Sequence, residues 1–367
     1  MNTRLPHPDT GRHHLKTNTT PTAVLAALGA AALFGASTPL AKQFVGDLSA
    51  LLLAGLLYLG SGVGLLGLRL MRDRGWRNPG LKRSEWPWLW GAIACGGVAG
   101  PTLLMLGLAH MSAASASLLL NLEGVLTALL AWIVFKENTD RRVMLGMLLI
   151  VLGGLALAWP GTSPSMTSDG LGAALITGAC LCWALDNNLT RQVSNSDALF
   201  IAGLKGIAAA IVNIGLALAL GHTLPPPSVV APVLLIGFLG YGVSLTLFVL
   251  ALRGLGSART GAYFGAAPFV GAAIAIGVFQ EPTSPLFWAA GLLMALGIWL
   301  HLTERHEHFH EHDPLQHGHP HRHDAHHQHT HTEPWDGQEP HDHVHNHAPL
   351  THNHPHFPDM HHRHEHR

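Results

Sequence analysis

Long apolar stretches separated by short polar turns run through most of the chain. Each stretch is roughly 20 residues long, the length that an α-helix needs to cross the hydrocarbon core of a bilayer. The stretches are apolar on all sides, whereas a membrane-spanning strand alternates polar and apolar positions over about 10 residues. The pattern predicts an all-α membrane protein with ten transmembrane helices, at residues 21–45, 49–70, 88–110, 112–135, 141–159, 170–192, 197–219, 231–252, 256–280 and 285–303.

The positive charges give these helices an orientation. Of the 21 Lys and Arg residues, 16 lie on one side if the helices alternate in direction, and the turns at 160–169, 221–230 and 281–285 carry none. Because cytoplasmic turns are enriched in Lys and Arg, both termini are expected in the cytoplasm of a multi-pass protein of the plasma (inner) membrane. Residues 1–20 are polar and lack the pattern of a signal peptide, so we expect a cytoplasmic N-terminal segment.

The apolar region contains an internal repeat. A shift of 144 positions places Phe135-Lys136-Glu137 on Phe279-Gln280-Glu281 without a gap, and a shift of 149 places Phe34 on Trp183 and Lys42-Gln43 on Arg191-Gln192. Each copy has five predicted helices, so the second copy enters the membrane from the opposite side. Such inverted repeats are found in many secondary transporters. The predicted units are residues 1–20, the first repeat at 21–159, the second repeat at 170–303 and a tail at 304–367.

Short motifs recur at equivalent places in the two copies. They are Phe34-Gly35 with Lys42, Cys182-Trp183 with Arg191, Phe135-Lys136-Glu137 with Gly146 and Gly153-Gly154, and Ala266-Ala267-Pro268 with Gln280-Glu281-Pro282, Gly291 and Gly297. Over residues 21–303 the chain resembles the drug/metabolite transporter superfamily, EamA type. The resemblance implies ten helices in two EamA repeats and a secondary carrier of small solutes. The family pattern has a proline in helix four; the second copy has Pro268, but the first has Gly124.

Glu123 is a candidate binding residue because it lies near the middle of the fourth predicted helix. A carboxylate at the centre of a bilayer costs about 2.5–3.5 kcal/mol, so it is expected to face a cavity, to bind a proton or to pair. One hypothesis is a substrate- or proton-binding acid. The alternative is a structural hydrogen bond to Asn121 or to a neighbouring helix.

Asp186 and Lys205 are further candidate substrate- or proton-binding residues, and they lie at similar depths on the adjacent sixth and seventh helices. We therefore expect a buried ion pair, unless Lys205 extends to the inner surface and Asp186 contacts water. Asn187, Asn188 and Asn213 are expected either to line the same polar cavity or to bond between helices. The three cysteines lie in apolar segments and predict no disulfide framework.

The tail is dominated by histidine. Residues 301–366 contain 24 of the 29 histidines, and the composition predicts a disordered segment. Imidazole binds Zn, Ni, Co and Cu, and the tail is expected to bind such ions whether or not it has a physiological role as a buffer, sensor or donor. The candidate ligands recur as His-x-His: His306, His308, His310, His312, His317, His319, His321, His323, His341, His343, His345 and His347.

Composition and motifs favour one function over three others. Only 12% of residues are charged, half the usual share for a soluble domain, and no phosphate-binding Gly-rich loop is present. We predict a secondary transporter, not an enzyme, for small metabolites or drugs, as an exporter coupled to protons. It needs the lipid bilayer, no obligatory cofactor and no nucleic acid, and a homodimer is compatible with the family fold. The alternatives are a divalent-metal transporter, a metal sensor and a membrane metalloenzyme.

Overall fold

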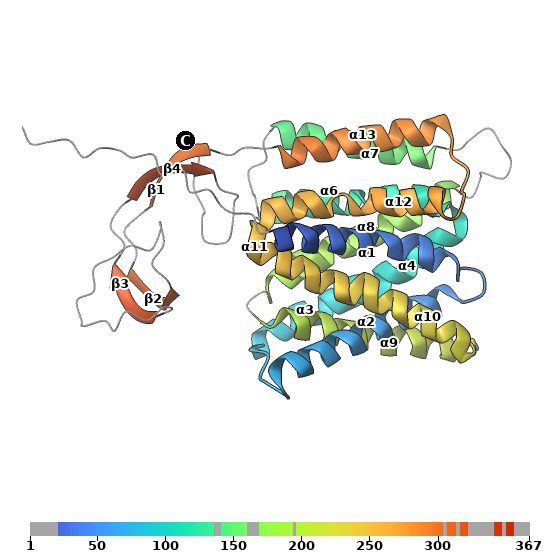
Figure 1. Cartoon of the computed structure of the whole chain (residues 1–367), viewed down its shortest axis with the longest axis horizontal. Coiled ribbons are helices and arrows are strands. Elements are labelled where there is room, and N and C mark those ends of the chain that lie inside the picture. Colours follow the sequence, from blue (N-terminus) through green and yellow to red (C-terminus); the bar gives the residue numbers. More distant parts are fainter. Residues whose placement is uncertain are drawn as a thin grey trace, which may run out of the picture. The chain divides into compact units, whose positions relative to one another are not determined.

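The structure is a computed structural model that describes residues 21–135, 141–159, 169–193 and 196–303, together with four short strands beyond residue 303. The chain divides into two units, Met1–Leu302 and Thr303–Arg367. The first unit is a bundle of helices (Figure 1). The second contains the described strands.

The first half of the bundle begins with two uninterrupted helices and continues with two interrupted ones. The side chain of Ser49 caps the second helix by accepting a hydrogen bond from the Leu52 N–H. The elements are α1 (Pro21–Lys42), α2 (Ala50–Asp73), the 3₁₀ turn η1 (Arg83–Glu85), α3 (Trp86–Ala92), the π-helical η2 (Ile93–Ala99), α4 (Gly100–His110), α5 (Ala113–Leu119), α6 (Leu122–Phe135) and α7 (Arg141–Ala158).

The second half repeats this order of elements. Its members are α8 (Asp169–Arg191), α9 (Ala198–Ala219), α10 (Pro227–Gly237), the π-helical η4 (Phe238–Val243), α11 (Ser244–Phe264), α12 (Ala267–Gly277) and α13 (Pro285–Leu302). The π-helical segments η2 and η4 lie at equivalent positions under the 144-residue shift. The break between α5 and α6 likewise matches the break between α11 and α12. The internal repeat seen in the sequence is therefore also present in the local backbone structure.

The break in the first copy forms without the family's proline. Leu120 and Asn121 separate α5 from α6, and the Asn121 amide donates a hydrogen bond of 2.8 Å to the carbonyl of Leu118. A polar side chain thus satisfies a carbonyl that the interrupted helix leaves without its usual partner. In the second copy, Pro268 lies in the first turn of α12, where its missing N–H costs nothing.

The chain turns back on itself within α11. The rings of Phe248 and Phe264 lie 4.9 Å apart, although sixteen positions along a straight helix span about 24 Å. The chain therefore reverses direction between these two rings, within Ser244–Phe264. The helix end predicted near Leu255 does not appear as the end of a separate element.

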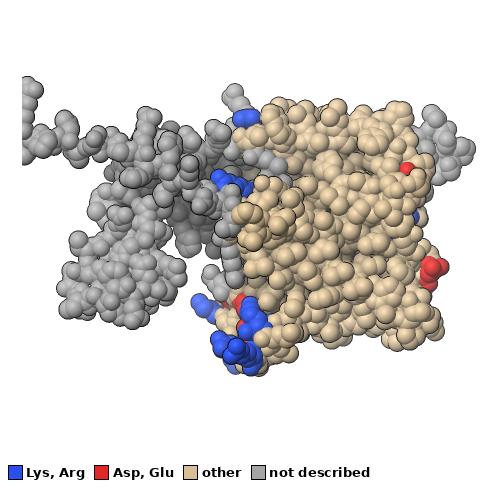
Figure 2. All heavy atoms as spheres, viewed as in Figure 1, with Lys and Arg blue, Asp and Glu red and all other residues tan. Residues whose placement is uncertain are grey.

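Seven of the described helical segments are long and apolar enough to cross a membrane. They begin at residues 21, 50, 83, 113, 170, 198 and 227, and the described part of the chain adds shorter apolar helices at Arg142–Ala158, Ala267–Gly277 and Pro285–Leu300. In Figure 2 the sides of the bundle carry almost no charge, while Lys and Arg gather at one end. The protein is accordingly a multi-pass membrane protein.

Helix pairs from the two halves pack against each other. The most extensive contacts join α2 to α9 and α7 to α13, and α1 packs on α11 and α12 (Figure 1). Glycine makes the closest of these contacts possible. A Cβ atom added at Gly206 on α9 would lie 2.6 Å from the Cα of Gly62 on α2, and one added at Gly237 would lie 1.9 Å from the carbonyl oxygen of Leu57. Small residues allow such close approach where apolar side chains gain little by leaving lipid.

One end of the α2–α9 pair is fixed by charge. Asp197 caps α9 by accepting from the Phe200 N–H at 2.9 Å, and it pairs with Arg72 and Arg69 of α2. Burial raises the pKa of Asp197, but hydrogen bonds from Arg72 and Phe200 outweigh it and hold the pKa below its ordinary value. The Arg69 guanidinium also lies 5.2 Å from the ring centres of Trp76 and Phe200.

The described residues of the tail form two antiparallel strand pairs. Strand β1 (Glu307–His312) pairs with β4 (Leu350–Pro355), and β2 (Gln316–His321) pairs with β3 (His341–Asn346). The expectation of a disordered tail is therefore not confirmed for these four segments. The physical reason is the period-two alternation of His-x-His, which suits an extended strand as well as a disordered chain.

The contact between α2 and α9 generates a stability prediction. The substitution Gly206→Ala is expected to destabilise the protein by roughly 1–3 kcal/mol, because the new methyl group overlaps the backbone of α2. The substitution Gly215→Ala on the same helix meets no atom within 4 Å and is the matched control. Thermal unfolding in detergent measures both. Equal melting temperatures for the two variants would contradict the observed helix approach.

Candidate functional site

An unusual acid lies just after the break between α5 and α6. Glu123 is in the first turn of α6 and is partly buried. Its Oε1 accepts a hydrogen bond of 2.9 Å from the amide of Asn187 on α8, which also lies 3.4 Å from the hydroxyl of Thr127. The alternative partner expected from the sequence, Asn121, instead bonds to Leu118 and lies 3.8 Å from the sulfur of Met294. The side chain of Asn121 therefore bonds to the backbone at the helix break and not to Glu123.

An ion pair joins α8 to α9 beside this acid. The ammonium of Lys205 lies 2.5 and 2.6 Å from the two carboxylate oxygens of Asp186, and their side chains are 16% and 9% exposed. Thr190 donates a further hydrogen bond of 2.8 Å to Asp186 and accepts one of 3.4 Å from Lys205. The pair expected from the sequence is confirmed. Two buried opposite charges with an added hydroxyl satisfy most of each other's hydrogen-bonding capacity.

The π-helical segment η2 packs directly on this pair. A Cβ atom at Gly96 would lie 1.9 Å from an oxygen of Asp186, so the glycine backbone is in contact with the carboxylate. The carbonyl of Gly96 accepts hydrogen bonds from the Tyr58 hydroxyl at 2.8 Å and from the Trp183 indole at 3.0 Å. π-Helical turns often mark functional sites because they alter the regular backbone hydrogen bonding.

The other two predicted asparagines, Asn188 and Asn213, bond to backbone carbonyls. Asn188 donates to the carbonyl of Ala184 at 2.8 Å and to that of Thr127 at 3.4 Å. Asn213 is buried and donates to the carbonyl of Gly97 at 3.4 Å. Both therefore bond between helices, as one of the two alternatives expected. Asn187 is the predicted amide that contacts Glu123.

Sequence reasoning missed several members of the cluster. Thr190 lies four residues after Asp186 on one helix face, so helical spacing could have identified it. Tyr58, Gly96 and Thr127 come from other helices, and no local pattern marks them. Aromatic rings from several helices also contact one another, with Phe34 5.3 Å from Phe264 and 6.0 Å from Tyr241, and Tyr58 5.7 Å from Tyr241.

Metal ligands were predicted in the tail. Within the part of the chain that the structure describes, no group of three or more His, Cys, Asp or Glu could hold a metal ion. The strand registers place His310 opposite His352 and His319 opposite His343 along the backbone. The predicted ligands His306, His323 and His347 lie outside the described residues. The others fall in strands: His308, His310, His312, His317, His319, His321, His341, His343 and His345.

Comparison with known proteins decides the family. The model of the EamA-like transporter family matches residues 21–159 and 170–303. The chain belongs to the EamA-like transporter family. It is thus a membrane transporter of the drug/metabolite type, and transporters of this family are generally not enzymes. The two matched ranges also coincide with the two halves of the helical bundle.

The chain resembles individual relatives to different degrees. The chain is 27% identical to an uncharacterized transporter of Methanothermobacter thermautotrophicus over 281 residues, which are 73% of this chain and 82% of that relative. It is 41% identical over 110 residues, 29% of this chain and 91% of the relative, to a probable 4-amino-4-deoxy-L-arabinose-phosphoundecaprenol flippase subunit ArnE of Pseudomonas paraeruginosa. A solved crystal structure matches with a TM-score of 0.55 at 19% identity, covering 76% of this chain and 96% of that one, which shows the shared fold.

The ion pair between Asp186 and Lys205 leads to a prediction about stability. Removing one partner, as in Asp186→Asn or Lys205→Met, is expected to destabilise the protein by roughly 3–5 kcal/mol, because the remaining charge is left buried without a counterion. The double variant should recover part of this loss. Unfolding of all four proteins in one detergent measures the coupling. Additive losses in the double variant would show that the two charges do not stabilise each other.

Proposed function

We propose that this EamA-like protein is a secondary transporter that moves small organic solutes across the cytoplasmic membrane by alternating access. Ten crossings in two inverted repeats of five fit the family, the matched breaks in the two halves and the reversal within α11. In this arrangement both termini lie in the cytoplasm. Repeat interfaces near the midplane are where such transporters bind their substrates and coupling ions.

The contrast between two acids carries the proposal. Asp186 has an ammonium partner at 2.5 Å, whereas Glu123 accepts a hydrogen bond from the neutral amide of Asn187. A partly buried carboxylate that is bonded to a neutral group gains free energy by binding a proton or a cationic group. We assign this binding to Glu123, with Asn187 and Thr127 beside it. Asp186, Lys205 and Asn188 fix the helices that carry these groups.

The substrate class follows from the surroundings of Glu123. Tyr58 interacts electrostatically with Glu123 and contacts the ring of Tyr241. A carboxylate with an aromatic ring in reach suits an amphipathic or drug-like solute with a basic group, because cations are attracted by both. Two relatives are named as probable 4-amino-4-deoxy-L-arabinose-phosphoundecaprenol flippase subunits, and the compound in that name is likewise amphipathic. Proton exchange at the same carboxylate would drive export. A homodimer is compatible with this function and is not needed for it.

Replacing the acid tests the proposal directly. The substitution Glu123→Gln is expected to abolish solute movement driven by a pH gradient, since the amide can no longer exchange a proton, while the protein stays folded. The full-length chain in proteoliposomes, screened with amino acids, cationic dyes and divalent metals, provides the measurement. The control is Glu85→Gln, which changes an acid in η1 at the end of the bundle. Unchanged gradient-driven flux in Glu123→Gln would refute the assignment.

The histidine tail is proposed to bind transition metals without being the route of transport. Replacing all 24 histidines of residues 301–366 by Gln should remove most Zn²⁺ and Ni²⁺ binding, because neutral imidazole supplies the ligands. The rate of solute transport should stay unchanged. Calorimetric titration and the proteoliposome assay measure the two properties on the same preparation. A metal flux that disappears with these histidines would instead make the metal the cargo.

A further inference from the structure

The junction between α4 and α5 is held by two charged side chains from distant parts of the chain. α4 ends at His110 and α5 begins at Ala113. The ammonium of Lys42, at the end of α1, donates hydrogen bonds to the carbonyl oxygens of Leu108 and Met111. The carboxylate of Glu281, which follows α12, accepts hydrogen bonds from the N–H groups of Ala113 at 3.0 Å and Ala114 at 2.8 Å.

Each charge complements the helix end that it contacts. The last carbonyls of a helix attract a cation, and its first N–H groups attract an anion. Lys42 and Glu281 also attract each other across the junction. We call these two side chains, with the junction between α4 and α5, the outer clasp, because the distribution of positive charge places this end outside the cytoplasm.

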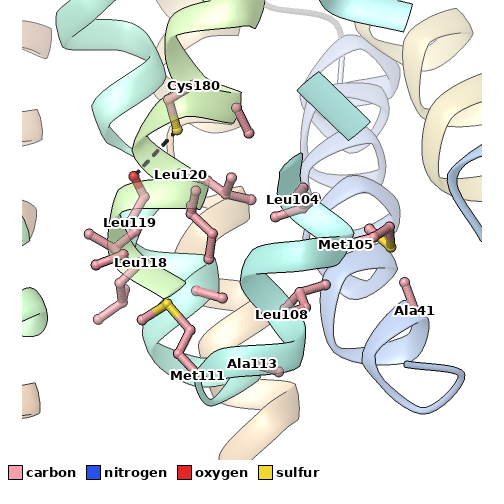
Figure 3. Packing of buried hydrophobic residues seen from close by; sticks show 14 of the residues in the cluster. Ala41, Leu104, Met105, Leu108, Met111, Ala113, Leu118, Leu119, Leu120 and Cys180 are labelled. Atoms are coloured by element: carbon pink, nitrogen blue, oxygen red, sulfur yellow. Dashed lines mark hydrogen bonds between the residues drawn. The ribbon is translucent and has the colours of Figure 1, made fainter. Parts of the chain in front are cut away.

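A dense apolar cluster lies beneath the outer clasp. Leu104, Leu108, Leu118 and Leu119 are each at most 2% exposed (Figure 3). Cys180 of α8 lies on the far side of these residues, is buried, and points its sulfur at the carbonyl of Leu119, 3.7 Å away. The outer end of the bundle is therefore closed here by apolar packing that the two charged residues hold in register.

We propose that Lys42 and Glu281 form a gate that keeps the outer end closed, and that release of their contacts with the α4–α5 junction opens this end during transport. The inference rests on the proposed transport function and adds the residues that control its conformational step.

Accessibility of Cys180 from outside tests the gate. In the full-length chain with Cys95→Ser and Cys182→Ser, a membrane-impermeant maleimide is added to the outer face. Glu281→Gln and Lys42→Gln are each expected to raise the labelling rate of Cys180 several-fold, because fewer contacts hold the junction closed. Asp47→Asn, an exposed acid at the same end, is the control and should match the parent.

The outcomes separate the gate from misfolding and from the transport proposal. An unfolded variant would label from both faces, whereas an opened gate raises labelling from the outer face alone. Unchanged labelling in both Glu281→Gln and Lys42→Gln overturns the gate. Labelling needs no substrate, so raised outer labelling in a protein that moves no solute would keep the gate and reject the proposed function.

Discussion

A bilayer offers backbone amide groups nothing to bond with, so each N–H and C=O within it must find a partner inside the protein. Regular helices meet this requirement, and at three irregular places in this bundle side chains meet it instead. At the break between α5 and α6, the side chain of Asn121 donates a hydrogen bond to a backbone carbonyl. In η2, Tyr58 and Trp183 donate hydrogen bonds to the carbonyl of Gly96. At the junction between α4 and α5, Lys42 bonds to backbone carbonyls and Glu281 to backbone N–H groups. The polar residues of the apolar core are thus largely fixed by the irregular backbone.

The same environment explains how the helices associate. Apolar side chains gain little by exchanging lipid for protein, so association depends on close packing. Gly62 and Gly206 bring α2 and α9 into backbone contact, and Asp197 with Arg69 and Arg72 fixes one end of that pair. The two halves therefore meet along a seam of small residues, and the π-helical turn at Gly96 lies close to it. Lys205 precedes Gly206 on α9, so the ion pair with Asp186 of α8 lies beside this seam, and α8 in turn contacts Glu123 of α6.

Glu123 and Asp186 differ in what the fold provides for them. Asp186 receives an ammonium, a threonine hydroxyl and the close backbone of Gly96, so its negative charge is compensated and its position is fixed. Glu123 accepts its hydrogen bond from the neutral amide of Asn187. The two acids lie on helices that pack together, α6 and α8, and their direct partners differ in charge. This difference is the basis on which we propose different roles for them.

The sequence alone determined the membrane class, the approximate helix positions, the internal repeat and the pairing of Asp186 with Lys205, because hydrophobic length, positive charge and the depth of polar residues are local properties of the chain. It also marked Glu123 as an unusual acid and Glu281 as part of a repeated motif. Tertiary structure decided their partners: Asn187 for Glu123, the first amides of α5 for Glu281, and Tyr58 for Gly96. These contacts join residues 38 to 168 positions apart. Helical periodicity carries no information at that range, since the packing of whole helices fixes which side chains meet.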